Sequence, residues 1–166
     1  MLAYLLIVLG VVSRLIVHVP NFTPVIAIAL FSGVYLKKKY AVVLMLALMA
    51  ITDVFLGFHN IMFFTWGSFA LIAVLGTTMK GKVNFKSIFS GSLLAAIFFF
   101  VVTNFGVWLV SGMYERSFAG LVTCFTMAIP FFRYTAASAL IYSFVLFGGY
   151  ELIASRIKST SLATAL

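Results

Sequence analysis

The sequence predicts an all-α integral membrane protein, a bundle of six transmembrane helices with both termini on the cytoplasmic side. Hydrophobic residues make up 64% of the 166 residues and charged residues only 8%, which leaves too little polar surface to cover a soluble globule. The apolar runs are continuous and lack the alternation of barrel strands, so the spans are expected to be helices. At about 20 residues for each crossing, the length allows about six spans. We therefore expect a single domain over residues 1–155 and a cytoplasmic tail over 156–166.

Prolines, glycines and polar runs divide the chain into the expected spans. The first covers about 2–17, and Pro20 and Pro24 bracket the turn that follows it. The second, with about 13 residues, is short for a crossing of about 20, so either the bilayer thins around it or residues 21–23 lie deep in the protein. The expected spans after the first are 24–36, 40–57, 61–79, 87–111 and 131–154.

The apolar piece 118–129, closed by Pro130, is expected to be a short helix in an outer loop and not a seventh crossing. Lysines follow the second and fourth spans, and Arg156 and Lys158 lie on the same side only if two spans intervene. By the positive-inside rule that side is cytoplasmic. The net charge of +8 is then an orientation signal and a contact with the anionic headgroups of the bilayer, and nucleic-acid binding is not expected.

With this orientation, the strongly polar residues of the spans gather in the outer third of the bundle. An acid within a span costs roughly 2.5 to 3.5 kcal/mol at mid-membrane and normally faces a partner or a wet cavity. Asp53 is therefore expected to pair with Arg133 or Arg14, as a structural ion pair or as the floor of a site. The layer comprises Arg14, Asp53, Trp66, Asn104, Trp108 and Arg133, with Asn21 in the loop just above.

Each of these residues also has an ordinary structural interpretation. The arginines can reach out to headgroups, and the tryptophans lie where aromatic belts occur. A buried asparagine such as Asn104 can simply join helices. His59 fits a solvated loop histidine, and Cys124 fits a small buried hydrophobic residue.

Motifs for catalysis or for cofactors are not found in the sequence. It has no Ser/His pair set in glycine-rich turns, no second intramembrane aspartate, no His/Glu metal motif and no phosphate-cradling loop. We therefore expect no cofactor, no metal and no enzymatic activity. Any role driven by ATP requires a partner protein.

Four segments of the chain resemble a family of small bacterial membrane proteins assigned to transport: RLIVHVPNFTPVIAIALFSGVYL, ITDVFLGFHN, TNFGVWL and AIPFFRYT. That family is more distantly similar to the substrate-binding S components of energy-coupling factor (ECF) transporters. Those are six-helix proteins that capture a vitamin in an outward-facing pocket and depend on a transmembrane coupling subunit with ATPases. The resemblance implies such a partner and a multi-pass location in the bacterial cytoplasmic (inner) membrane. The first span departs from the S components, because it lacks the Ala-x-x-x-Ala pattern with which their first helix docks to the coupling subunit. Transport without such a partner therefore stays open as an alternative.

The expected function is that of a membrane transport protein that takes up a small, vitamin-like solute. The tryptophans would stack on a ring, the asparagines would hydrogen-bond it, and the arginines would favour a carboxylate or phosphate. Two alternatives stay open: a membrane enzyme acting on a lipid or prenyl substrate with Asp53 and His59 as acid and base, and an accessory subunit without a ligand. The expected solute-binding residues are Arg14, Asn21, Asp53, Trp66, Asn104, Trp108 and Arg133.

Overall fold

The computed structural model describes residues 21–158, together with Leu5, Val8 and Val12. All regular elements within 21–158 are helical, so the predicted all-α class is confirmed for this part of the chain. The first expected span lies outside the described residues apart from those three positions, and so does the expected tail from residue 159 on, whereas its residues 156–158 continue a helix. The elements are α2 (Val25–Tyr35), α3 (Lys38–Leu56), α4 (Met62–Gly76), the short 3-10 helix η1 (Thr77–Met79), α5 (Phe85–Val110) and α6 (Phe118–Lys158).

Four stretches of helix within the described residues are long and apolar enough to cross a membrane. Their outer faces carry large hydrophobic side chains, such as Phe55 and Phe63, which are 75% and 77% exposed. Such surface suits contact with lipid tails and is unfavourable in water. The helices are therefore those of a multi-pass membrane protein. They cover Lys38–Leu56, Met62–Met79, Phe85–Val110 and Phe118–Arg156.

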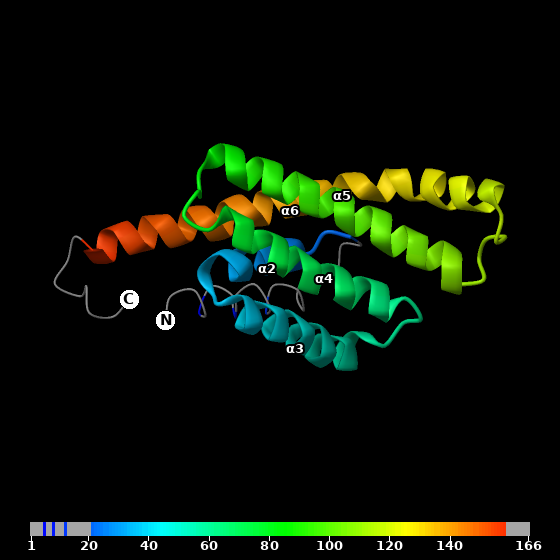
Figure 1. Cartoon of the computed structure of the whole chain (residues 1–166), viewed down its shortest axis with the longest axis horizontal. Helices are drawn as coiled ribbons and strands as arrows, with labels where there is room; N and C mark the ends of the chain where they lie inside the picture. Colours follow the sequence, from blue (N-terminus) through cyan, green and yellow to red (C-terminus); the bar gives the residue numbers. More distant parts are fainter. Residues whose placement is uncertain (1–4, 6–7, 9–11, 13–20, 159–166) are drawn as a thin grey trace.

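The short helix α2 forms the centre of the bundle. All its residues from Val25 to Val34 are buried, and it packs against α3, α4, α5 and α6 (Figure 1). Its 11 residues rise about 17 Å, roughly half the thickness of the hydrocarbon core. Of residues 21–23, which were expected either to lie deep in the protein or to face a thinned bilayer, Asn21 is exposed and Phe22 and Thr23 are half-buried, while Pro24 after them is buried. The turn is therefore not deeply buried.

Glycines bring α2 and α4 into close contact. A methyl group placed on Gly33 would collide with the backbone carbonyl of Ala73, and one on Gly76 with the carbonyl of Leu30. Small residues at such crossings let two helix backbones approach each other. This contact fixes the position of α2 along α4 and therefore the position of the turn at its start.

The predicted break at Pro130 is wrong. The structure has one continuous helix of 41 residues, α6, with Pro130 inside it, so residues 118–129 and 131–154 do not form separate elements. Pro130 is exposed at the surface of the helix, and membrane helices tolerate proline where the freed carbonyl finds another partner. At about 60 Å, α6 runs the full length of the bundle beside α5 (Figure 1).

Replacing this proline by alanine is expected to raise the thermal unfolding midpoint in detergent by a few degrees. Pro130→Ala restores an N–H that can donate to the carbonyl of Thr126, and a proline in a helix interior costs about 3 kcal/mol. The exposed ring contributes little packing that could be lost. Circular dichroism measures the midpoint. Pro24→Ala, at the N-cap of α2, is the control and should not raise it, while a lower midpoint for Pro130→Ala would contradict the prediction.

Candidate functional site

Two adjoining cavities lie around the start of α2. The first has a volume of about 170 Å³ and lies among α2, α3, α4, α5 and α6. The second has about 230 Å³ and lies among α4, α5 and α6. Both are lined by Asn21, Thr65, Phe99 and Thr135, so they share a boundary. The remaining lining residues of the first are Thr23, Val25, Ile26, Met49, His59, Phe69 and Ser138, and of the second Ile61, Phe100, Thr103, Asn104, Val107, Ala128, Phe131 and Phe132.

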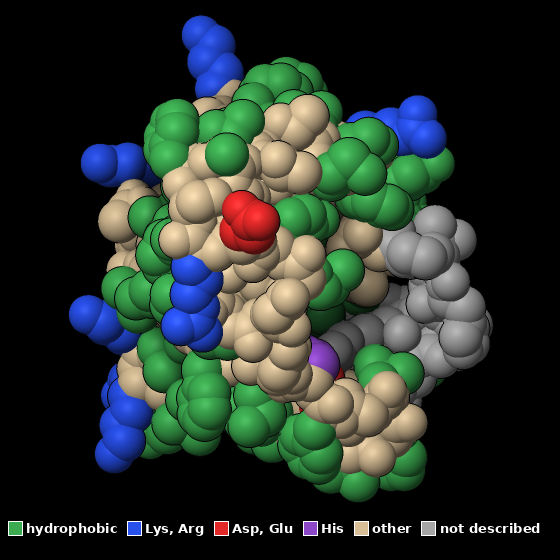
Figure 2. All heavy atoms as spheres, turned by 90° about the vertical axis from the view of Figure 1, so that its right-hand side faces the viewer, with side chains coloured by type: hydrophobic (Ala, Val, Ile, Leu, Met, Phe, Trp, Pro, Cys, Tyr) green, Lys and Arg blue, Asp and Glu red, His purple; other side chains and the backbone are tan. Residues whose placement is uncertain are grey.

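The cavities lie in the half of the bundle away from the lysines, between the middle of the bundle and the end opposite the lysines. α2 starts at the cavities and ends beside the run of lysines at 37–39, and the link between α4 and α5, with its lysines at 80 and 82, also lies at that far end. Figure 2 looks onto the end of the bundle nearest the cavities, where hydrophobic side chains, backbone and uncharged polar side chains cover most of the face. An acidic and a basic side chain lie next to each other on this face, and the other basic side chains project at its edges. The polar cavities therefore open into a weakly charged end of an apolar bundle.

The chain enters α2 through a turn that directs the helix N-terminus at the first cavity. Asn21 has a φ of 60°, a left-handed conformation that asparagine adopts more readily than most residues. Pro24 is the N-cap, and no side chain among the described residues caps the helix. The first N–H groups of a helix lack partners within it, and Val25 and Ile26, whose N–H groups are among these, are both buried and line the cavity.

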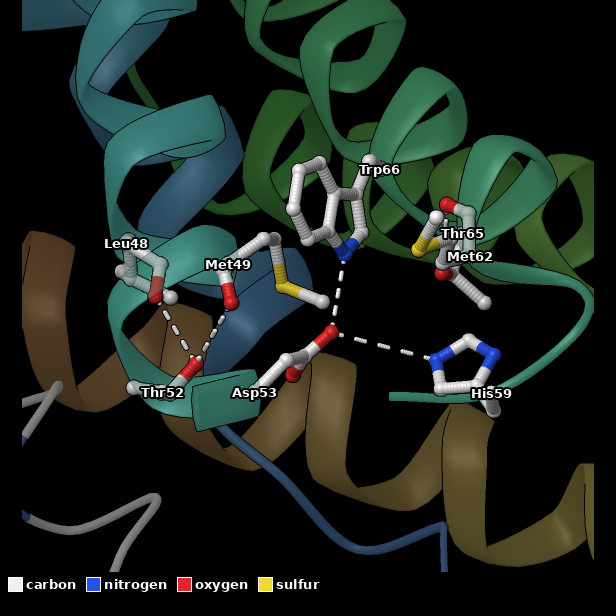
Figure 3. A network of polar contacts seen from close by, with 8 residues as sticks. All are labelled: Leu48, Met49, Thr52, Asp53, His59, Met62, Thr65 and Trp66. Atoms are coloured by element: carbon white, nitrogen blue, oxygen red, sulfur yellow. Dashed lines mark hydrogen bonds and ion pairs between the residues drawn. The ribbon is translucent and has the colours of Figure 1, made fainter. Parts of the chain in front are cut away.

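A buried carboxylate borders the first cavity. Asp53, in the last turn of α3, is 2% exposed and accepts a hydrogen bond of 2.8 Å from the indole Nε1 of Trp66 on α4 (Figure 3). The Nε2 atom of His59, in the link between the two helices, lies 3.9 Å from the same carboxylate oxygen. Gly57 ends α3 with a φ of 97°, and its N–H donates to the carbonyl of Asp53 at 2.8 Å. Of these residues only His59 lines the cavity, so the network meets the cavity through the imidazole.

Aromatic rings supply the apolar walls of both cavities. Phe69 and Phe99 stack with a centroid distance of 4.8 Å and an interplanar angle of 23° beside the first. Phe100 and Phe132 lie 5.0 Å apart beside the second. Rings held in this way offer flat faces on which a planar solute can stack.

The structure brings four of the predicted site residues to this region. Asn21 lines both cavities and Asn104 lines the second. Asp53 and Trp66 lie in the network that borders the first cavity, and neither is among the residues that line it. Arg14 lies outside the described residues.

Two predicted site residues lie elsewhere. Trp108 donates from Nε1 to the backbone carbonyl of Glu115 at 3.0 Å and does not line either cavity. Arg133 is exposed, donates to the hydroxyl of Tyr134 at 2.9 Å, and holds its guanidinium 4.7 Å from that ring. Asp53 was expected to pair with Arg133 or with Arg14. Among the described residues Asp53 does not form an ion pair with Arg133, and Arg14 lies outside the described residues.

Sequence reasoning missed the hydroxyl groups of the lining. Thr65, Thr103, Thr135 and Ser138 are buried and line the cavities, yet serine and threonine are ordinary residues in membrane helices and give no signal alone. The sequence signal that could have identified these four residues is their position in the outer halves of three predicted spans. His59, interpreted as a solvated loop histidine, also lines the first cavity, with its side chain 39% exposed.

Within the described residues, no three His, Cys, Asp or Glu side chains lie close enough together to hold a metal ion. Asp53 and His59 form a pair of possible ligands, and the thiol of Cys124 lies instead against the backbone carbonyl of Asn104 at 3.4 Å.

Comparison with known proteins identifies a family whose function is unknown. A search of the curated proteins and a search of the solved structures returned no match to the chain. One family description, "Family of unknown function (DUF6580)", matches residues 1–162, nearly the whole chain. The chain therefore belongs to the DUF6580 family.

Proposed function

We propose that the protein is a membrane transport protein that binds a small water-soluble solute in the two adjoining cavities for uptake. The observation that carries the proposal is the pair of cavities lined by hydroxyl, amide and imidazole groups inside a bundle of apolar helices. Polar groups at membrane depth are costly and tend to line solute pathways. A half-length helix whose N-terminus ends at a cavity is also a recurrent feature of transporter binding sites.

The proposed orientation places the cavities on the outer side of the bacterial cytoplasmic membrane. Lysines at 37–39, 80 and 82 lie at the end away from the cavities, and basic residues mark the cytoplasmic side. With a first span over about 2–17, the protein has six transmembrane helices and both termini in the cytoplasm. A solute then enters from outside and meets the turn at Asn21 first.

The proposed energy source is a partner. The resemblance to ECF S components supports a transmembrane coupling subunit with ATPases, since the chain itself has no nucleotide-binding motif. The missing Ala-x-x-x-Ala pattern on the first span means that such a partner has to dock on another helix. Facilitated passage without a partner is the alternative form of the same proposal.

A second candidate is a membrane enzyme acting on a lipid or prenyl substrate. The contact between Asp53 and His59 favours it, because a buried carboxylate 3.9 Å from an imidazole can orient that ring as a base at the cavity. Incubation of the purified protein with membrane lipid extract tests this candidate. A new lipid product that disappears in His59→Ala would support the enzyme over the transport protein.

Mass spectrometry of co-purified small molecules tests the transport proposal. Repeated detergent preparations are expected to carry the same small solute, and Thr135→Leu is expected to lose it because Thr135 lines both cavities and a larger side chain fills them. Thr123→Leu, an exposed position on the same helix α6, is the matched control and should retain the solute. Repeated preparations without a recurring solute would contradict the proposal, as would equal retention by both variants.

A further inference from the structure

The inference rests on the proposed function and concerns the chemistry of the solute. We propose that the cavities select an uncharged planar ring compound with N–H donors, and reject carboxylates and phosphates. Three observations support this preference: the direction of the hydrogen bonds made by the lining, the charge of the lining, and the size and shape of the cavities.

Three of the five hydroxyls in the described lining present acceptors to the cavities. Thr65 donates its proton to the carbonyl of Met62 at 2.9 Å, Thr103 to that of Phe99 at 2.7 Å, and Ser138 to that of Thr135 at 3.0 Å. A hydroxyl has one proton and two lone pairs, so a proton used within the helix leaves only lone pairs for a ligand. These three groups, from α4, α5 and α6, therefore favour a solute that brings donors.

The amide of Asn104 adds to this acceptor set. Its Nδ2 donates to the carbonyl of Phe100 at 2.8 Å, which directs that end of the amide toward its own helix. The Oδ1 oxygen remains able to accept a hydrogen bond at the second cavity, and the second Nδ2 proton remains able to donate one. A solute with an amino group can donate to it directly.

The α2 end of the first cavity has the opposite character. The N–H groups at the start of α2, beside Val25 and Ile26, carry the partial positive charge of a helix N-terminus. A neutral acceptor, such as a ring nitrogen or a carbonyl, suits that partial charge. The solute is thus expected to carry N–H donors on one edge and an acceptor on another.

Full charges are missing from the described lining of both cavities. It contains no lysine, arginine, aspartate or glutamate, and His59 is its one ionisable group. The exposed Arg133 contacts Tyr134 outside both cavities. An anion moved from water into a site without a cationic partner loses strong hydration that neutral acceptors cannot replace. The described lining, which does not include the expected Arg14, therefore favours a neutral solute over a carboxylate or phosphate.

The volumes of the cavities are large enough for a single ring in each. An apolar cavity of about 150 Å³ holds a benzene molecule, and the two volumes here are about 170 and 230 Å³. The stacked rings of Phe69 and Phe99 offer a flat wall to the first. A planar heterocycle with N–H groups can stack on the aromatic wall and donate hydrogen bonds to the acceptors at the same time.

Three pyrimidines of similar size separate the chemical classes. Purified protein in lipid nanodiscs is titrated by calorimetry with 2-aminopyrimidine, 2-methylpyrimidine and pyrimidine-2-carboxylate. The amino compound has donors, the methyl compound has the same shape without them, and the third is an anion. We expect the amino compound to bind at least about ten times more tightly than either of the others, because its N–H groups meet unpaired acceptors.

A matched pair of variants localises the effect. Thr65→Val keeps the shape of the side chain and removes the acceptor, so it is expected to weaken 2-aminopyrimidine about 5- to 10-fold without changing 2-methylpyrimidine. Thr123→Val is the control, since Thr123 is exposed on α6 and bonds the carbonyl of Ala119 in the same way at 2.9 Å. It should leave both affinities unchanged.

The outcomes separate this inference from the proposed function. Tightest binding of the carboxylate, or equal binding of the amino and methyl compounds, overturns the donor preference while the binding of a solute stands. A further outcome is that none of the three compounds binds while a solute still recurs in purified preparations. In that case a recurring solute that lacks N–H donors overturns the inference, and a recurring solute that carries N–H donors supports it. If none binds and no solute recurs, the proposed function fails as well.

Discussion

Adding one methyl group at Gly33 is expected to lower the free energy of unfolding by about 3 kcal/mol and to reduce the folded yield. The Cβ of Gly33→Ala would collide with the backbone carbonyl of Ala73 on α4, and a backbone atom cannot move aside as the end of a side chain can. Overpacking in a tight interior costs about 1–3 kcal/mol or more. Because α2 is buried along its length, separating it from α4 disturbs its contacts with the other helices as well.

Two further glycine variants test whether contact with α4 is the cause. Gly76→Ala would collide with the carbonyl of Leu30 from the other side of the same crossing and should cost a similar amount. Gly67→Ala lies on α4 with nothing within 4 Å of the added Cβ, so it should leave stability unchanged or raise it slightly through helix propensity. Thermal unfolding in detergent gives the midpoints. Equal midpoints for Gly33→Ala and Gly67→Ala would show that the crossing tolerates extra volume.

The positions of the helices were largely predictable because the lipid environment demands long apolar runs. The bounds of α2, α3 and α5 fall within about two residues of the expected spans, which is the usual spread of helix ends. The expected span 61–79 is α4 followed by η1. Pro130 misled the prediction, since proline ends helices in water more strictly than inside a membrane bundle. A sequence pattern alone does not show through which prolines a helix continues.

The position of the candidate site along the bundle axis was predictable from the sequence, but the side chains that line it were predictable only in part. Asn21 and Asn104 reach the cavities because polar groups at that depth need a wet or polar neighbourhood. Trp108 and Arg133 share the depth but point elsewhere, since rotation about the helix axis decides which side chains face inward. That rotation depends on packing at contacts such as the one around Gly33. The weak periodicity of helices that are apolar all round does not encode it.

Removing the carboxylate of Asp53 is the second change expected to have a large effect. Asp53→Ala leaves the indole N–H of Trp66 without its acceptor in a partly buried place and also removes the contact with His59. An unsatisfied buried donor costs about 1–3 kcal/mol, and more where a charged group is involved. We therefore expect a loss of about 2–3 kcal/mol in the free energy of unfolding. Trp66→Phe, which removes the donor and shrinks the ring but leaves no buried donor unsatisfied, should cost less. Trp108→Phe makes the same change of ring outside this network and is the matched control.

The variant Asp53→Asn separates a structural role of this network from a role in binding. Its amide keeps an oxygen that can accept from the indole of Trp66, so the folded yield and the midpoint should stay close to those of the parent protein. It loses the negative charge beside His59, whose ring lines the first cavity. If the carboxylate orients that ring for the solute, Asp53→Asn lowers solute retention about tenfold while the fold persists, as one lost hydrogen bond to a charged group would. Unchanged retention by Asp53→Asn, together with a coupling of about 1 kcal/mol between Asp53→Ala and Trp66→Phe, would instead assign the network to stability alone.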